Sequence, residues 1–138
     1  MEDVMKRILI VDDDSDIRMI LRSVLESYGY QCEEASNGLK ALEQIEVQDY
    51  ALILLDYSMP VMNGLEVIHK LTQGSKRFCP QIVMMTANAD LNLHVQALNA
   101  GASAVLSKPF DIDHVLLTIE RSLQKDRRYS SSCCQSPP

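Results

Sequence analysis

The chain has 138 residues, enough for one domain with a packed core, and its 46% hydrophobic and 23% charged residues exclude disorder over most of its length. The formal charge of −6 argues against a sequence-independent grip on nucleic-acid phosphates, and no apolar run approaches the roughly 20 residues of a membrane span. The start shows no signal-peptide core and the spacing of the four cysteines fits neither a disulfide framework nor a zinc site, so we expect a cytoplasmic domain that binds neither membranes nor nucleic acid.

Five short segments predict β-strands. Four of them are apolar at successive positions, which is typical of strands buried on both faces of a parallel sheet. These four are residues 8–11, 51–55, 82–85 and 104–106. A fifth segment, residues 31–35, is more polar and suits an edge strand.

Helical patterns alternate with these strands. The expected helices span residues 17–28, 39–45, 64–72, 90–99 and 112–123. Ser36 or Asn37 suits the N-cap of the second helix, Asp111 suits that of the last, and Gly101 is expected to end the fourth. The alternation of five strands with five helices predicts an α/β fold, a doubly wound parallel sheet with helices on both faces.

We expect the folded domain to cover residues 1–125. Beyond it, residues 126–138 contain four serines, two cysteines, two prolines and no apolar period. Such a composition predicts a flexible tail or the start of a linker.

Polar side chains follow the strands of the predicted sheet. Because the carboxyl ends of parallel strands share one edge, residues distant in the sequence are expected to meet there. They are Asp12 and Asp13 after the first strand, Asp56 after the third, Thr86 after the fourth and Lys108 after the fifth. Clustered carboxylates repel one another unless a cation lies among them, and an all-oxygen ligand set that leaves room for waters and a phosphate suits Mg²⁺.

The same residues suit phosphoryl chemistry. Lys108 is able to neutralise a phosphoryl oxygen and Thr86 to donate a hydrogen bond to another. Asp56 stands alone at the centre of the edge, and a carboxylate nucleophile beside Mg²⁺ is a known route to an aspartyl phosphate. We therefore take Asp56 as the candidate nucleophile.

Other polar residues have plainer interpretations. Asp14 is interpreted as a turn former or helix cap, not as a ligand. His69, His94 and His114 fall at scattered helical positions and are expected to be exposed to solvent.

Five sequence blocks stand in register with one another. They are ILIVDDD at residues 8–14, LLDYSMPVMNG at 54–64, MMTA at 84–87, AGA at 100–102 and KPF at 108–110. Together they resemble the receiver domains of two-component response regulators, over about residues 6–124. The Asp-x-x-Met-Pro-x-Met-x-Gly run of the second block is the most specific part of this resemblance.

The resemblance implies a metal-assisted phosphoacceptor. Asp56 would take a phosphoryl group from a sensor histidine kinase or a histidine phosphotransfer protein. Mg²⁺, with Mn²⁺ as an alternative, would be held by Asp13 and Asp56 directly, by Asp12 largely through water, and by the backbone carbonyl of Ser58. Ser58 and Asn88 occupy the two positions that tune the lifetime of the phosphoryl group in this family.

The resemblance also implies how the phosphoryl group is held. Thr86 and Lys108 would contact its oxygens, and the small Ala87 would leave the site open. Pro109 is expected to follow a cis peptide bond, which fixes the direction of the lysine. The strand order would be 2-1-3-4-5, that of a flavodoxin-like (βα)5 fold, with the polar second strand at an edge.

One position departs from the family pattern. Receivers usually carry Phe or Tyr on the fifth strand three residues before the lysine, where the ring rotates inward on activation, and this chain has Val105. The resemblance implies a phosphorylation-activated switch in the surface formed by the fourth helix, fifth strand and fifth helix, acting on a downstream protein or output domain outside this chain. It implies no enzymatic activity beyond self-phosphorylation and autodephosphorylation at Asp56.

The sequence leaves two alternatives to a phosphorylation-activated, free-standing receiver. It also leaves open whether phosphorylation promotes formation of a homodimer. Val105 favours a receiver-like interaction module that phosphorylation does not control. The Ser/Pro-rich end is equally compatible with the N-terminal receiver fragment of a larger regulator.

Overall fold

The computed structural model describes residues 6–73, 79–88 and 90–124, so the predicted tail at 126–138 lies outside the described residues. The strands are β1 (Arg7–Val11), β2 (Gln31–Ala35), β3 (Leu52–Asp56), β4 (Gln81–Thr86) and β5 (Ala104–Ser107). The helices are α1 (Ser15–Ser27), α2 (Gly38–Val47), α3 (Gly64–Gln73), α4 (Leu91–Ala100) and α5 (Ile112–Leu123). Each lies within two residues of its predicted position.

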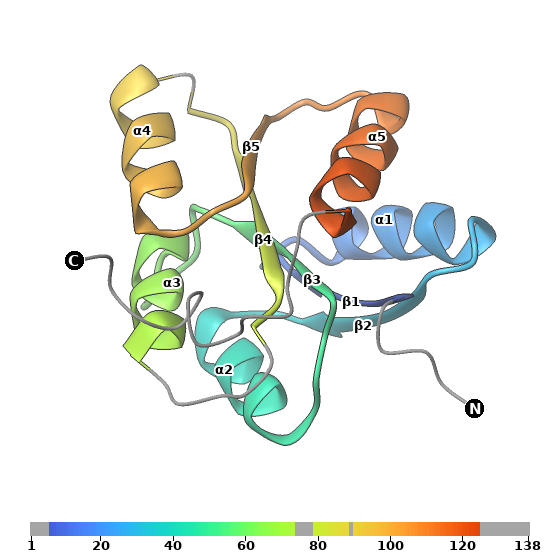
Figure 1. The fold of residues 1–138 in the computed structure, drawn as a ribbon, viewed down its shortest axis with the longest axis horizontal. Coiled ribbons are helices and arrows are strands. Elements are labelled where there is room, and N and C mark those ends of the chain that lie inside the picture. Colours follow the sequence, from blue (N-terminus) through green and yellow to red (C-terminus); the bar gives the residue numbers. More distant parts are fainter. Residues whose placement is uncertain (1–5, 74–78, 89, 125–138) are drawn as a thin grey trace.

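The strands form a single parallel sheet (Figure 1). Their order is β2-β1-β3-β4-β5, which confirms the doubly wound, flavodoxin-like topology and the edge position of the polar strand β2. The register pairs Val11 of β1 with Leu55 of β3, and Thr86 of β4 with Ser107 of β5. The carboxyl ends of all the strands therefore lie along one edge.

The core has two layers because side chains of each central strand alternate between the faces of the sheet. On one face, strand residues pack against α1 and α5 through Leu21, Leu25, Val115 and Ile119. On the other face, strand residues pack against α2, α3 and α4. Burial on both faces explains why the central strands are continuously apolar.

Side chains cap the helices close to where the sequence predicts. Asp14 caps α1 by accepting from the backbone N–H groups of Asp16 and Ile17, as interpreted. Asn37, and not Ser36, caps α2, while Asp111 caps α5. Gly101 ends α4 at φ 125°, a conformation that favours glycine.

Three expectations need correction. The sequence repeats apolar residues at helical spacing along α1, at Ile17, Ile20, Leu21, Val24, Leu25 and Tyr28, which predicts one buried stripe; Ile20 and Tyr28 are instead 51% and 62% exposed. Cys79 is disulfide-bonded, which its spacing in the sequence did not predict, whereas Cys32 is a buried free thiol. His94 is half-buried, unlike the exposed His69 and His114.

Within the described ranges, no helix has the length and apolar character needed to cross a membrane.

Candidate functional site

The carboxyl edge of the sheet brings together side chains from four strand ends. Asp12 follows β1, Asp56 ends β3, Thr86 ends β4 and Lys108 follows β5. Asp12, Asp56 and Thr86 are buried, with exposed fractions of 0%, 3% and 1%. Polar groups this deep at a strand end are retained where they meet partners or ligands.

Lys108 is the cation of the site. Its Nζ donates to Oδ2 of Asp12 over 2.9 Å and to Oδ1 of Asp56 over 3.1 Å. Burial by itself lowers the pKa of Lys108, but the hydrogen bonds to Asp12 and Asp56 outweigh it and leave the pKa raised. The side chain is therefore a fixed positive charge beside both carboxylates.

Asp56 is only partly compensated by that charge. Burial is the largest influence on its carboxyl group, and the nearby charge of Asp12 acts in the same direction; Lys108 opposes both. The net result raises the pKa of Asp56 to about 6. A second cation at this place would relieve the remaining repulsion.

Three carboxylates are placed to accept such a cation. One oxygen each from Asp12, Asp13 and Asp56 lies within 4.8 Å of the others. Asp13 is exposed, whereas Asp12 is fixed by accepting the backbone N–H of Asp14 at Oδ1 over 2.9 Å. Hard oxygen ligands with one open side fit Mg²⁺, which retains part of its water shell in proteins. The residues present therefore fit the metal.

Thr86 ends β4, which neighbours β3 on the side away from β1. Its Oγ1 accepts the backbone N–H of Asn88 over 2.9 Å, and the hydroxyl carries one hydrogen to donate. Ala87 and Asn88 are exposed in the loop that follows β4, and Ser58 is exposed in the loop that follows β3. These loops border the same edge of the sheet.

Two further predicted positions lie on and after β5. The Lys108–Pro109 peptide bond is cis, as expected. Val105 is half-buried and packs against the core cluster on the α2, α3 and α4 face of the sheet. Its side chain has one stiff torsion and no ring to rotate.

Sequence reasoning missed two residues that position Asp12 and Asp56. Arg18 of α1 donates from Nη1 to the carbonyl oxygen of Asp12 over 2.6 Å and is itself paired with Glu34 over 3.0 Å. Gly64 passes so close to β3 that a Cβ there would lie 2.9 Å from the carbonyl oxygen of Asp56. The motif contains Gly64, but the close approach that requires glycine is visible only in the tertiary structure.

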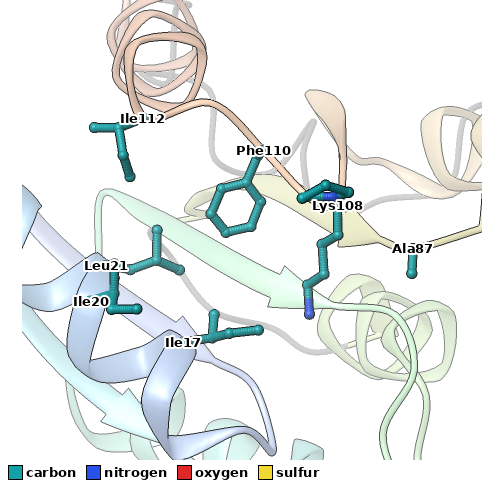
Figure 2. A pocket seen from close by; sticks show the side chains of 8 residues that line it. Ile17, Ile20, Leu21, Ala87, Lys108, Phe110 and Ile112 are labelled. Atoms are coloured by element: carbon teal, nitrogen blue, oxygen red, sulfur yellow. The ribbon is translucent and has the colours of Figure 1, made fainter.

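An apolar groove of about 450 Å³ adjoins the site (Figure 2). It is lined by Ile17, Ile20, Leu21, Ala87, Lys108, Pro109, Phe110 and Ile112. Figure 2 shows isoleucines of α1 facing Phe110, with the Lys108 side chain extending toward the end of β3. The exposure of Ile20, unexpected for the stripe of α1, places an apolar side chain on this groove.

Comparisons with known proteins agree with this geometry. Residues 8–120 match the family described as the response regulator receiver domain. Sporulation initiation phosphotransferase F of Bacillus subtilis is 34% identical over 118 residues, which cover 86% of this chain and 94% of that protein. Transcriptional regulatory protein ZraR of Klebsiella oxytoca is 36% identical over 132 residues, which cover 94% of this chain but 29% of that protein.

Solved structures extend the similarity to three dimensions. Response regulator protein TrrA of Thermotoga maritima, solved in complex with Mg(2+)-BeF, superposes with a TM-score of 0.75. It is 32% identical, and the superposition covers 85% of this chain and 98% of that one.

Proposed function

Since the chain belongs to the response regulator receiver domain family, we propose that it is a phosphorylation-activated switch with Asp56 as its phosphoacceptor. The observation that carries the proposal is the position of Asp56, buried between the carboxylates of Asp12 and Asp13 and the ammonium of Lys108. A domain that only bound partners would gain nothing from a buried carboxylate whose pKa is raised to about 6.

The reaction is a phosphoryl transfer from a phosphohistidine of a sensor kinase or phosphotransfer protein. An Oδ atom of Asp56 attacks phosphorus, a P–O bond forms and the P–N bond breaks. The electron pair of that bond returns to the imidazole nitrogen, which then takes up a proton. The products are an aspartyl phosphate and a neutral histidine.

Residues of this chain hold the reacting groups. Mg²⁺, when bound by Asp12, Asp13, Asp56 and the Ser58 carbonyl, would neutralise the charge that gathers on the phosphoryl oxygens. The ammonium of Lys108, which donates to Asp56 in the structure, would donate to one phosphoryl oxygen instead.

Thr86, at the end of β4, would donate its hydroxyl hydrogen to another phosphoryl oxygen. Ala87 leaves space beside the group, and Ser58 with Asn88 would border the approach of the water that hydrolyses it. We propose no other catalytic activity for the chain.

The apolar groove is suited to the phosphohistidine donor. It is lined by Lys108, by the exposed Ile20 and by the half-buried Phe110, and Lys108 donates to the reacting carboxylate of Asp56. A donor helix that buries apolar side chains there would bring its histidine to the open side of the site. A cytoplasmic location stays a prediction.

Transfer would act on the surface formed by α4, β5 and α5. The phosphoryl group adds about −1.5 to −2 charge, and Thr86 moving toward it would change how α4 packs on β5. The downstream protein or output domain lies outside this chain, and phosphorylation-dependent homodimerisation stays open. The chain spans 29% of ZraR and 52% of SrrA of Staphylococcus aureus but 94% of sporulation initiation phosphotransferase F, so its relatives include both larger regulators and single receivers.

Intact-protein mass spectrometry tests the proposal. After incubation with Mg²⁺ and a small-molecule phosphodonor, we expect one added phosphoryl group, absent without Mg²⁺ and absent in Asp56→Asn. Asp49→Asn, at an acidic position outside the site, is the matched control and should be labelled normally. If a control receiver is labelled and this chain is not, at every time from seconds onward, the interaction module becomes the better interpretation.

A further inference from the structure

His94 of α4 is more buried than the sequence predicts. The residue is half-buried, and its Nε2 is a buried side-chain nitrogen for which the described part of the chain provides no hydrogen-bond partner. A buried polar atom without a partner costs free energy, so such atoms are rare in native structures and deserve an explanation.

Helix geometry places this imidazole on the β5 side of α4. The α4 helix packs against α3 and β5, and Figure 1 shows α3 below it and β5 to its right. Gln96 lines a pocket with Leu65 and His69 of α3, so Gln96 marks the α3 side of α4. Successive helical residues are about 100° apart, so His94 points about 200° away from Gln96, toward the opposite side.

Strand geometry places Val105 and Ser107 on the same side. Val105 packs against the core layer that includes Ala97 of α4, and side chains two apart on a strand share a face. Ser107 therefore projects toward α4, and it pairs in register with Thr86 of the site. His94 lies in the first turn of α4, where its backbone N–H reaches the carbonyl of Asp90, so it is near the same end of the sheet as Ser107.

We propose that His94 and Ser107 form the polar switch that takes the place of the missing aromatic ring on β5. In the structure, the imidazole Nε2 is buried and has no hydrogen-bond partner among the described residues. When Thr86 moves toward the phosphoryl group, α4 shifts and Nε2 pairs with the Ser107 hydroxyl. A hydroxyl both donates and accepts, so either neutral tautomer of the imidazole makes this bond.

The inference rests on the proposed phosphorylation of Asp56 and adds a positioning residue to it. Its thermodynamic content is a population shift, because one hydrogen bond present only in the active state favours that state. A bond of ordinary strength corresponds to roughly a three- to tenfold change in the affinity for a ligand selective for the active state. Beryllium fluoride with Mg²⁺ is such a ligand if the proposed function holds.

Binding of Mg²⁺ and beryllium fluoride to four proteins tests the pair. The proteins are the parent chain, His94→Leu, Ser107→Ala and the double variant. Each single variant should bind three- to tenfold more weakly, and the double variant no more weakly than His94→Leu, because the two residues act through one bond. Additive losses, or unchanged binding in either single variant, would overturn the inference.

Thermal unfolding without phosphoryl mimic separates switching from a merely structural role. His94→Leu should raise the unfolding temperature of the resting state, since an unpaired polar atom is replaced by an apolar one. Ser107→Ala should leave it unchanged, because the side chain is exposed. His94→Gln, which restores a polar group of similar reach, should recover much of the binding lost in His94→Leu.

Imidazole nitrogen NMR gives the direct readout. On adding Mg²⁺ and beryllium fluoride to histidine-labelled protein, the Nε2 resonance of His94 should move to a hydrogen-bonded value, while exposed His69 and His114 change little. If the mimic binds and His94 does not respond, the inference fails and the proposed function stands. If neither the mimic nor a phosphoryl group binds, both fail.

Discussion

The Nζ atom of Lys108 lies 3.1 Å from Oδ1 of Asp56, a residue 52 positions earlier in the chain. The same ammonium donates to Asp12 over 2.9 Å, so one cation serves two buried carboxylates. Removing one partner of such a group leaves charge without compensation where water is excluded. The stability of the metal-free domain and the charge on Asp56 are therefore linked through Lys108.

Lys108→Met should destabilise the metal-free domain. We expect the free energy of unfolding at pH 7 to fall by roughly 1–3 kcal/mol, because Asp12 and Asp56 lose their shared counter-charge while the apolar stem of the side chain is retained. Urea unfolding followed by circular dichroism measures this. Lys40→Met, on the exposed surface of α2, is the control and should change stability little. Equal losses in the two variants would contradict the prediction.

Asp56 should make stability depend on pH in the opposite sense from a carboxylate whose pKa is lowered on folding, because burial and Asp12 outweigh its ion pair with Lys108. Its folded-state pKa is raised from 3.8 to about 6, so between these values the folded protein binds more protons than the unfolded chain. Stability from this group is present below pH 4 and is lost as the pH rises through 6. At pH 7.5 without Mg²⁺, the free energy of unfolding of Asp56→Asn should therefore exceed that of the parent by roughly 1–3 kcal/mol.

The comparison of the two proteins across pH is the measurement. The difference in unfolding free energy should stay nearly constant from pH 7.5 down to about 6 and then shrink steadily between pH 6 and pH 4. A constant difference over that range would mean that the carboxyl group does not titrate as described.

Mg²⁺ should stabilise the domain through Asp13 but not through its neighbour Asp14. The Asp13 carboxylate lies in the cluster with Asp12 and Asp56, whereas Asp14 is the N-cap of α1. Binding to the folded state alone adds about 2.7 kcal/mol at a hundredfold excess over Kd. Asp13→Asn should reduce the Mg²⁺-dependent rise in unfolding temperature substantially.

Asp14→Asn is a matched control for that measurement. It removes the same charge from the adjacent position and keeps a side chain that caps helices. The rise in unfolding temperature on adding Mg²⁺ should be close to that of the parent. Similar losses in the two variants would indicate a diffuse effect of negative charge and no specific site.

Val61 in the loop after β3 should be a site of stored strain. Its φ is 72°, a conformation unfavourable for a β-branched residue, and the N–H of Met62 reaches the carbonyl of Pro60 across it over 2.8 Å. The side chain is 89% exposed, so little packing is lost on substitution. Val61→Asn should raise the free energy of unfolding by roughly 0.5–1.5 kcal/mol, because asparagine tolerates this conformation.

Val47→Asn is the control for backbone conformation. Val47 is 84% exposed but ends the ordinary helix α2, so the same exchange there should give no gain in stability. Chemical denaturation of both variants gives the comparison. A gain at position 47 equal to that at 61 would point to exposed hydrophobicity as the cause.

Much of the fold was predictable because the strands are buried on both faces. Continuous apolar runs such as residues 8–11 and 51–55 are incompatible with a half-exposed sheet, and the helices between them fix a parallel topology. Because the carboxyl ends of parallel strands share one edge, the sequence also predicts that Asp12, Asp56, Thr86 and Lys108 lie together. The detailed strand order came from the family resemblance and is confirmed.

Other parts of the site were not predictable from local patterns. Arg18 reaches the carbonyl of Asp12 through a contact that no spacing encodes, and the close approach of Gly64 to Asp56 depends on how α3 meets β3. The histidine pattern suggested an exposed His94, because helical periodicity does not reveal that β5 covers one side of α4.

The sequence by itself determined which residue types stand at the strand ends, because burial on both faces fixes strands, topology and edge. Only the tertiary structure decided that Lys108 bridges two carboxylates, that Ile20 lies on a groove and that Nε2 of His94 is buried with no hydrogen-bond partner in the described ranges. These features depend on distances between elements far apart in the chain. Periodicity along one element carries no information about such distances.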